Sequence, residues 1–360
     1  MTDYKKEIES LMATVIKEGA SDLHLSVGHR PTIRVSGNLL PLVNVPELSA
    51  TDTEGFAKTL LGPELLKDFL INKEMDFSYS SSGGVSGELG SRFRGNAFFQ
   101  MGKMGIALRL IPSQIKSLEE LRLPPILGDI ARMKQGFFLV VGPVGQGKST
   151  TLASMVQLIN TDRAEHIVTI EDPIEYMYPE GQSIIDQREV RFDTQDFHIA
   201  LKSMFRQDVN VGLIGEMRGP ETISTAVTAA ETGHLILSTL HTNSASQTID
   251  RIIDSFTAAQ QAQVRIQLAG SLIGIFSQRL VPRIAGGRTV VYELLLNNAA
   301  VSNLIREGRT HEINIVLETG AESGMINMNH TIAEAVRAGE ITTDDAYRYT
   351  LNPDGLQRLL

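Results

Sequence analysis

The chain has 360 residues, of which 42% are hydrophobic and 21% charged, a balance typical of a globular protein with room for two cores. Its formal net charge of −9 disfavours a protein that binds nucleic acid along the phosphate backbone, and the absence of cysteine excludes disulfides and cysteine-ligated zinc. Neither a secretory signal nor an apolar run of ~20 residues is evident, so we expect a cytoplasmic protein that meets a membrane only through a partner.

The first third of the chain mixes helices and strands without regular order. Apolar residues three and four positions apart predict a helix over 3–18, and alternation predicts a strand in SDLHLSVG. TIRVSGNLLPL is typical of two strands joined by a turn; a helix over roughly 51–71, two strands around a Ser/Gly-rich turn and a strand at GIALRLI follow. We therefore expect a small α+β domain over 1–112 and a linker over 113–120.

The remainder of the chain, 121–360, has a different pattern. GFFLVV, IVTIED, VGLIGE and HLILSTLH are short apolar runs of the kind that form parallel strands buried on both faces. Helical stretches separate these runs, which predicts an α/β sheet covered on both sides. From about 257 onward we expect mainly helices, with one strand at 289–296.

The stretch GPVGQGKST has the form of a phosphate-binding loop, since it matches G-x-x-x-x-G-K-[ST] between a predicted strand and a predicted helix. Glycines let backbone N–H groups point at phosphate oxygens, and the helix adds its positive end. This context favours nucleotide binding over a glycine-rich turn with an exposed lysine. Lys148 would neutralise phosphate charge, and the Ser149 hydroxyl would reach Mg²⁺. The predicted nucleotide-binding residues are Gly142, Pro143, Val144, Gly145, Gln146, Gly147, Lys148, Ser149 and Thr150.

Acidic residues follow two of the predicted strands: Glu171, Asp172 and Glu175 after the first, and Glu216 after the second. In open α/β sheets, sites form at the carboxyl ends of the strands. These acids are therefore placed to converge on the phosphate loop, where hydrolysis needs groups that hold Mg²⁺ and orient water. The alternative is that they are solvated strand ends.

Two histidines and three arginines are weaker candidates for functional residues. His234 and His241 lie at the two ends of one predicted strand, and their spacing alone favours a structural role. Arg94 shares a strand face with Arg92, and Arg109 lies on the next predicted strand. Residue chemistry alone favours a solvated sheet face here, although arginine is the usual partner of γ-phosphate charge in a transition state.

Several motifs together resemble the type IV pilus retraction ATPase family (PilT-like, twitching motility) of the secretion ATPases, nearly end to end. They are SDLHLSVG, RFRGNAF, GPVGQGKSTT, IEDPIEY, QREV, GEMR, TAAETGHLILSTLHTNSA, TIDRIID and SNLIRE. The resemblance implies a PAS-like N-terminal domain and a RecA-like P-loop ATPase domain that assemble as a homo-hexamer. It also implies ATP and Mg²⁺ as cofactors, an inner-membrane pilus platform protein as partner, a possible second retraction ATPase, and a place at the inner face of the cytoplasmic membrane.

The resemblance also implies roles for individual residues. Glu175 corresponds to the general base and Glu216 to the Walker B glutamate, with Asp172 and Ser149 beside Glu216 at the Mg²⁺ site. The remaining implied roles are nucleotide sensors for His234 and His241, and arginine fingers for Arg94 and Arg109.

Four positions depart from the family pattern: Gly95, Asn210, Gly212 and Gly219. Glycine inside a strand costs roughly 0.5–1 kcal/mol and leaves space, so we expect a chemically complete site with a looser supporting shell.

Three alternative functions stay open. A pilus assembly or type II secretion ATPase usually has a longer N-terminal region and a tetracysteine zinc site, whereas this chain has no cysteine and carries SNLIREGRTHEI, close to a motif of retraction members. A poorly hydrolysing ring subunit that regulates a partner motor fits the altered residues near Glu216. A nucleic-acid-translocating ATPase is disfavoured by the acidic charge and by the lack of a basic, aromatic-rich groove.

Overall fold

A computed structural model describes residues 3–35, 37–81, 91–112 and 114–360 of the protein. The chain divides into two compact units, one of Met1–Gln114 with Glu175–Met177 and the other of Ile115–Ile174 with Tyr178–Leu360. The Ser/Gly-rich turn that the sequence predicts falls within 82–90, outside the described residues.

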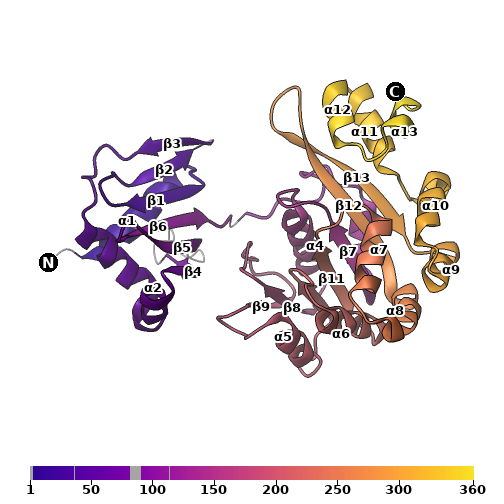
Figure 1. Ribbon diagram of the computed structural model, residues 1–360, viewed down its shortest axis with the longest axis horizontal. Helices are drawn as coiled ribbons and strands as arrows, with labels where there is room; N and C mark the ends of the chain where they lie inside the picture. Colours follow the sequence, from indigo (N-terminus) through magenta and orange to yellow (C-terminus); the bar gives the residue numbers. More distant parts are fainter. Residues whose placement is uncertain (1–2, 36, 82–90, 113) are drawn as a thin grey trace. The chain divides into compact units, whose positions relative to one another are not determined.

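The first unit is a six-stranded antiparallel sheet in the order β3-β2-β1-β6-β5-β4, with helices α1 (Tyr4–Lys17) and α2 (Ala50–Asn72) packed on one face (Figure 1). Its strands are β1 (Asp22–Ser26), β2 (Thr32–Val35), β3 (Asn38–Pro41), β4 (Glu74–Ser80), β5 (Arg92–Gln100) and β6 (Lys103–Leu110). Alternation along β1 places Leu23 and Leu25 in the core beneath the helices. This is the PAS-like α+β fold that the sequence predicts.

Gly95 does not loosen this sheet. Strand β5 runs through Gly95 without a break, and the ring of Phe77 on β4 lies directly over the glycine. A Cβ at this position would stand 2.2 Å from Cζ of Phe77, so the ring already fills the space that a side chain would take. The expectation of a looser supporting structure is therefore wrong at Gly95.

The second unit is built on a seven-stranded sheet in the order β13-β12-β7-β11-β10-β8-β9 (Figure 1). Neighbouring strands are parallel except β13, which runs antiparallel to β12. The strands are β7 (Gly136–Val141), β8 (His166–Glu171), β9 (Ile184–Glu189), β10 (Val211–Ile214), β11 (Leu235–Leu240), β12 (Leu272–Pro282) and β13 (Arg288–Leu296).

Helices cover both faces of this sheet, as the continuous apolar strands predict. Phe137, Leu139 and Val141 of β7 share one core with helices α5 (Phe197–Met204), α6 (Pro220–Glu231), α7 (Ala245–Asp254) and α8 (Ala258–Ser271). Helix α4 (Lys148–Asp162) contributes nothing to that core but packs on β7 and β11, so it covers the opposite face together with α3 (Ile126–Ala131).

The C-terminal part is helical, with α9 (Ala299–Glu307), α10 (Ile313–Thr319), α11 (Met328–Arg337), α12 (Thr343–Tyr349) and α13 (Pro353–Gln357). Residues of α11 to α13 form a separate small core with Val281 of β12 and Val291 of β13. The expectation of helix from 257 onward is wrong for β12, an 11-residue strand that pairs with β7 on one side and β13 on the other.

Gly212 leaves no empty space in the sheet of the second unit. A Cβ on Gly212 would lie 2.9 Å from Cδ1 of Ile236 and 3.0 Å from the sulfur of Met204, so these two side chains occupy the volume. The expectation of a looser core at this strand is wrong.

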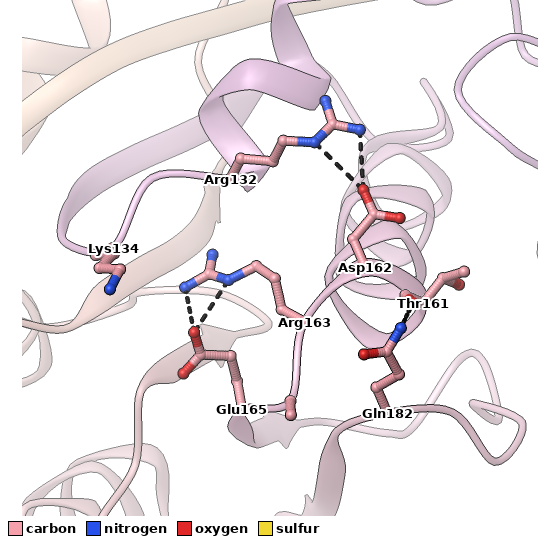
Figure 2. Close-up of a pocket in the computed structure, with 8 residues that line it drawn as sticks. Arg132, Lys134, Thr161, Asp162, Arg163, Glu165 and Gln182 are labelled. Carbon is pink, nitrogen blue, oxygen red and sulfur yellow. Dashed lines mark hydrogen bonds and ion pairs between the residues drawn. The ribbon is translucent and has the colours of Figure 1, made fainter.

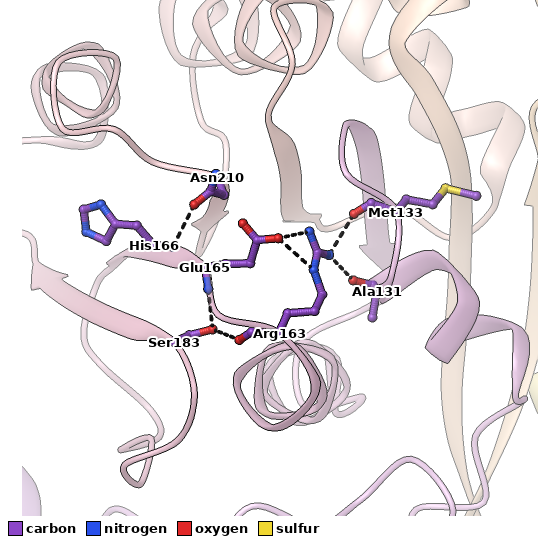
Figure 3. A network of polar contacts seen from close by, with 7 residues as sticks. All are labelled: Ala131, Met133, Arg163, Glu165, His166, Ser183 and Asn210. Atoms are coloured by element: carbon purple, nitrogen blue, oxygen red, sulfur yellow. Dashed lines mark hydrogen bonds and ion pairs between the residues drawn. The ribbon is translucent and has the colours of Figure 1, made fainter.

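Asn210 has a clear structural role. Its Oδ1 accepts a hydrogen bond of 2.8 Å from the backbone N–H of His166, at the start of β8 (Figure 3). An amide oxygen meets this requirement as well as a carboxylate oxygen, since the donor is a neutral peptide group.

Candidate functional site

The phosphate loop joins the carboxyl end of β7 to the start of α4. Gly147 is the N-cap of α4 with φ of 81°, and no side chain caps the helix. Gly147 has no side chain that could cap the helix, so the positive end of α4 faces the loop, as anion binding at a helix N-terminus requires. This is the strand–loop–helix geometry that the motif predicts.

Lys148 is folded over the loop. It is only 7% exposed, and its Nζ donates to the carbonyl oxygens of Gly142, at 2.8 Å, and Pro143, at 2.9 Å. The same Nζ lies 3.4 Å from Nδ1 of His241, at the end of β11. The ammonium group is thus held inside the loop by two carbonyl oxygens, in a position where phosphate oxygens of a nucleotide could replace them.

His241 lies between Lys148 and an acid. Its Nε2 lies 3.8 Å from a carboxylate oxygen of Glu216, whose other oxygen accepts from Arg218. Burial lowers the pKa of His241, and the charges of Lys148 and Arg218 lower it further, against the opposing effect of Glu216. A neutral ring can accept a hydrogen bond from Lys148 at Nδ1, whereas 3.8 Å from Nε2 to Glu216 is too long for a hydrogen bond. The four side chains therefore form a polar line of close contacts that is not hydrogen-bonded throughout.

The acids after β8 and β10 lie near one another at the carboxyl ends of these two strands. The two strands are parallel neighbours, with Ile170 opposite Ile214, so Asp172 and Glu216 both follow strand ends there. Asp172 is near enough to Arg218 to help raise the pKa of that guanidinium, behind the larger effect of Glu216. Sequence reasoning missed Arg218, although the GEMR motif contains it.

These residues suit Mg²⁺ that arrives with a nucleotide. No group of three or more His, Asp or Glu side chains able to hold a metal occurs in the described part of the chain. Mg²⁺ usually takes one or two carboxylates and completes its shell with water and phosphate oxygens. A hydroxyl at Ser149 and carboxylates at Asp172 and Glu216, all at the loop edge of the sheet, match that donor chemistry.

Two other acids of the β8 motif differ in environment. Glu171 is 8% exposed and its carboxylate accepts from Thr169 at 2.6 Å and from Gln187 at 3.2 Å, so these bonds occupy it inside the sheet. Glu175 is exposed, lies beyond β8 and groups with the first unit. Its role as general base stays a prediction.

His234 lies at the opposite end of β11 from His241. Its Nδ1 is 3.0 Å from the carbonyl oxygen of Ala229, and its ring packs edge-on against Phe205. The fold of the second unit does not bring His234 to the phosphate loop, because a six-residue strand separates the two histidines. Its role as a nucleotide sensor stays a prediction.

The two arginines of the first unit are register partners. Arg94 on β5 stands opposite Arg109 on β6, so both side chains leave the same face of the sheet. Nε of Arg109 bonds Oδ1 of Asp22 at 2.9 Å. Burial raises the pKa of Asp22, but hydrogen bonds from Ser21 and Arg109 outweigh burial, and the pKa is lowered. Asp22 belongs to the SDLHLSVG motif, and its pairing with Arg109 was not predicted.

A charged hollow of about 730 Å³ lies in the second unit, where β7 and β8 begin, and Figure 2 shows the residues that line it. Its arginines are already paired, Arg132 with Asp162 at 2.9 Å and Arg163 with Glu165 at 2.7 Å. Arg163 also donates to two carbonyl oxygens at the end of α3, as Figure 3 shows. These contacts connect the ends of α3 and α4 to the start of β8, which indicates a structural role for the residues of the hollow.

Comparisons with known proteins agree with this geometry. The family model described as "Type II/IV secretion system protein" matches residues 101–348. The "Type IV pilus retractation ATPase PilT" of Pseudomonas aeruginosa is 41% identical over 94% of this chain and 97% of its own length. A "Twitching motility protein" of Neisseria gonorrhoeae is 43% identical over 91% of this chain and 86% of its own length.

Solved structures agree as well. The "Crystal Structure of the Pilus Retraction Motor PilT and Bound ADP" has a TM-score of 0.89 and 42% identity, and the match covers 98% of this chain and 99% of that one. The fold and the site define a secretion ATPase, and the chain belongs to the type II/IV secretion system family. Within this family it belongs to the branch of the type IV pilus retraction ATPases, which confirms the resemblance seen in the sequence.

The described residues include no helix that is both long and apolar enough to cross a bilayer.

Proposed function

We propose that this protein is a hexameric motor ATPase that hydrolyses ATP to power type IV pilus retraction. The observation that carries the proposal is the polar line from Lys148 through His241 to Glu216 at the phosphate loop. It supplies a cation for the phosphates, a neutral histidine and an acid at the positions where a P-loop ATPase needs them. The retraction ATPases among the relatives supply the direction of the work.

Nucleotide binding starts at the loop. The N-terminus of α4 receives the phosphates, and Lys148 leaves the carbonyls of Gly142 and Pro143 for the β- and γ-phosphate oxygens. Ser149, Asp172 and Glu216 would hold Mg²⁺, which neutralises charge between the two phosphates when it is bound.

Hydrolysis then needs an activated water molecule and cationic groups that stabilise the charge on the γ-phosphate. Glu175 acts as the general base for in-line attack, and Glu216 supports the water. Arg94 and Arg109, reaching over from an N-terminal domain, stabilise the charge on the γ-phosphate. His241, which lies between Lys148 and Glu216, reports on the occupancy of the site, and His234 takes a sensing role as well.

Work comes from the ring. Six copies place ATP sites where neighbouring subunits meet, and loss of the γ-phosphate removes contacts that hold a site closed. Successive closures turn an inner-membrane platform protein and withdraw pilin into the membrane. The ring would therefore sit in the cytoplasm, at the inner face of that membrane. The "Type IV pilus ATPase PilU" of Pseudomonas aeruginosa, 39% identical over 98% of this chain, supports a second ATPase as partner.

The test is Mg²⁺-dependent ATP turnover of the purified protein beside Lys148→Ala, Glu175→Ala and Glu216→Gln. We expect each variant to lose at least about 100-fold of the turnover, because each removes a group from the reacting centre. Lys134→Ala is the matched control: it removes a lysine at the charged hollow and is expected to leave turnover unchanged.

Two outcomes would redirect the proposal. A folded, ring-sized protein without turnover would favour a regulatory ring subunit that binds nucleotide without hydrolysing it. Direction is tested in a piliated host that lacks its retraction ATPase: restored twitching supports retraction, whereas added pili without twitching would favour an assembly ATPase.

A further inference from the structure

We infer that Gln278 is a positioning residue that holds the phosphate loop in its nucleotide-binding shape from the neighbouring strand β12. The inference rests on the proposed nucleotide binding and adds to it a residue outside the loop motif.

Strand β12 continues past the point where its partner becomes the loop. The parallel pairing of β12 with β7 ends at Ser277 opposite Val141, and Gly142 opens the loop immediately afterwards. On the side that faced β7, the next residues of β12, Gln278 to Leu280, therefore run beside the loop, while their pairing with β13 continues on the other side. Gln278 is 1% exposed, so its side chain is committed to this contact.

The amide of Gln278 bridges the two sides of the loop. Its Oε1 accepts from the Thr151 hydroxyl on α4 at 2.7 Å, and its Nε2 donates to the Gln146 carbonyl at 2.6 Å. Lys148 and Ser149 lie between these two anchor points in the chain. The bridge needs a donor and an acceptor on one group, which a side-chain amide supplies and a carboxylate or an apolar side chain does not.

The backbone of β12 also contacts the loop. The N–H of Leu280 donates to Oε1 of Gln146 at 2.7 Å, so β12 holds Gln146 twice, at its carbonyl through Gln278 and at its side chain through Leu280. The strand also approaches so closely that a Cβ on Gly142 would lie 2.5 Å from the Gln278 carbonyl oxygen. The first glycine of the motif is thus required by β12 as well as by the loop.

A preformed loop binds nucleotide more tightly than one that must be ordered, because the apparent dissociation constant is the intrinsic one divided by the fraction of loops in the binding shape. Without the amide, the Gln146 carbonyl and the buried Thr151 hydroxyl each lose a partner. Two hydrogen bonds of this kind correspond to about a 10- to 100-fold loss of affinity. The reacting groups themselves stay in place, so turnover at saturating ATP changes little.

The experiment measures the dissociation constant of MgADP, with a fluorescent ADP analogue, and KM and kcat for MgATP in the full-length protein and three variants. Gln278→Leu removes both bonds. Gln278→Glu keeps the acceptor for Thr151 but places an oxygen against the Gln146 carbonyl. Thr151→Val removes only the hydroxyl donor. Gln267→Leu on α8, where the amide bonds Glu231, is the matched control.

We expect Gln278→Leu and Gln278→Glu to weaken ADP binding most and Thr151→Val to weaken it less, with KM raised and kcat within about threefold of wild type. An ADP affinity within twofold of wild type for folded Gln278→Leu would overturn the inference. If that variant fails to fold, unchanged affinity in both Gln278→Glu and Thr151→Val overturns it equally. A fall in kcat and in melting temperature at unchanged affinity would indicate a merely structural glutamine. Wild-type protein that binds no MgADP would instead sink the proposed function.

Discussion

The contact between Gly212 and Met204 gives a quantitative test of how the second unit is packed. Because Ile236 and Met204 fill the space above Gly212, Gly212→Val inserts atoms into an occupied volume. Overpacking of this kind costs about 1–3 kcal/mol. Met204 is fully buried, and Met204→Ala alone costs about 2–5 kcal/mol through lost burial and a residual cavity.

The two changes should offset each other. Valine at 212 occupies volume that Met204→Ala vacates, so the double variant is expected to cost at least about 1 kcal/mol less than the sum of the single costs. Hydrogen exchange of the β10 and β11 amides is the suitable assay, since a protein of two units need not unfold in one step. Each tenfold change in protection corresponds to about 1.4 kcal/mol.

Gly270→Ala on α8 is the control, because no atom lies within 4 Å of its added Cβ. It should stabilise its helix by about 0.5–1 kcal/mol and combine additively with Met204→Ala. Additive costs for Gly212→Val and Met204→Ala, or a stabilising Gly212→Val, would show that the strand is not packed as described.

Two further predictions concern a histidine and a glycine. Both ring nitrogens of His166 face acceptors, Asp186 at 3.0 Å and the Gln207 carbonyl at 2.8 Å; burial lowers its pKa, but these bonds outweigh burial and raise it. The stability that the pair contributes is therefore full below the unfolded pKa of about 6.5 and is lost as pH rises through the higher folded pKa. Melting temperatures of wild type and Asp186→Asn should differ more at about pH 5.5 than at about pH 8.5, and a gap independent of pH would contradict this assignment. Gly95→Ala should destabilise the first unit by about 1–3 kcal/mol, because Phe77 has to move; hydrogen exchange in β4 and β5 measures the loss, and Gly95→Ala combined with Phe77→Leu should recover part of it.

Much of the site could be predicted because its chemistry is local in the sequence. The loop glycines, Lys148 and Ser149 are consecutive, and their flanking strand and helix have clear patterns. Glu216 and His241 follow apolar strands, and parallel strands bring such ends together at one side of the sheet. For His241 the spacing alone favoured a structural role, and only the family resemblance implied a role at the site. Period-2 alternation likewise predicted most strands of the first unit.

What the sequence did not reveal depends on contacts between distant segments. The run LIGIFSQRLVP is apolar enough for a strand or a buried helix, and only its pairing with β7, far earlier in the chain, decides for the strand. Gln278 went unnoticed with it. Gly212 was expected to leave space in the core, and Gly95 to belong to a looser supporting shell. The sequence does not show that Met204 and Phe77 lie against these glycines, because such contacts follow no fixed spacing.

Strand β12 also gives the second unit a mechanical continuity. Gln278 and Leu280 grip the phosphate loop, and the very next residue, Val281, is embedded in the small core of α11 to α13. An extended strand bonded on both sides is stiff along its length, so a displacement of the loop that keeps these bonds must be carried into the C-terminal helices. Strand β12 thus connects the phosphate loop to the helices α11 to α13. Substitutions at Ile332 or Leu356, in the core of these helices, are expected to alter the conformation of the loop although neither residue contacts it.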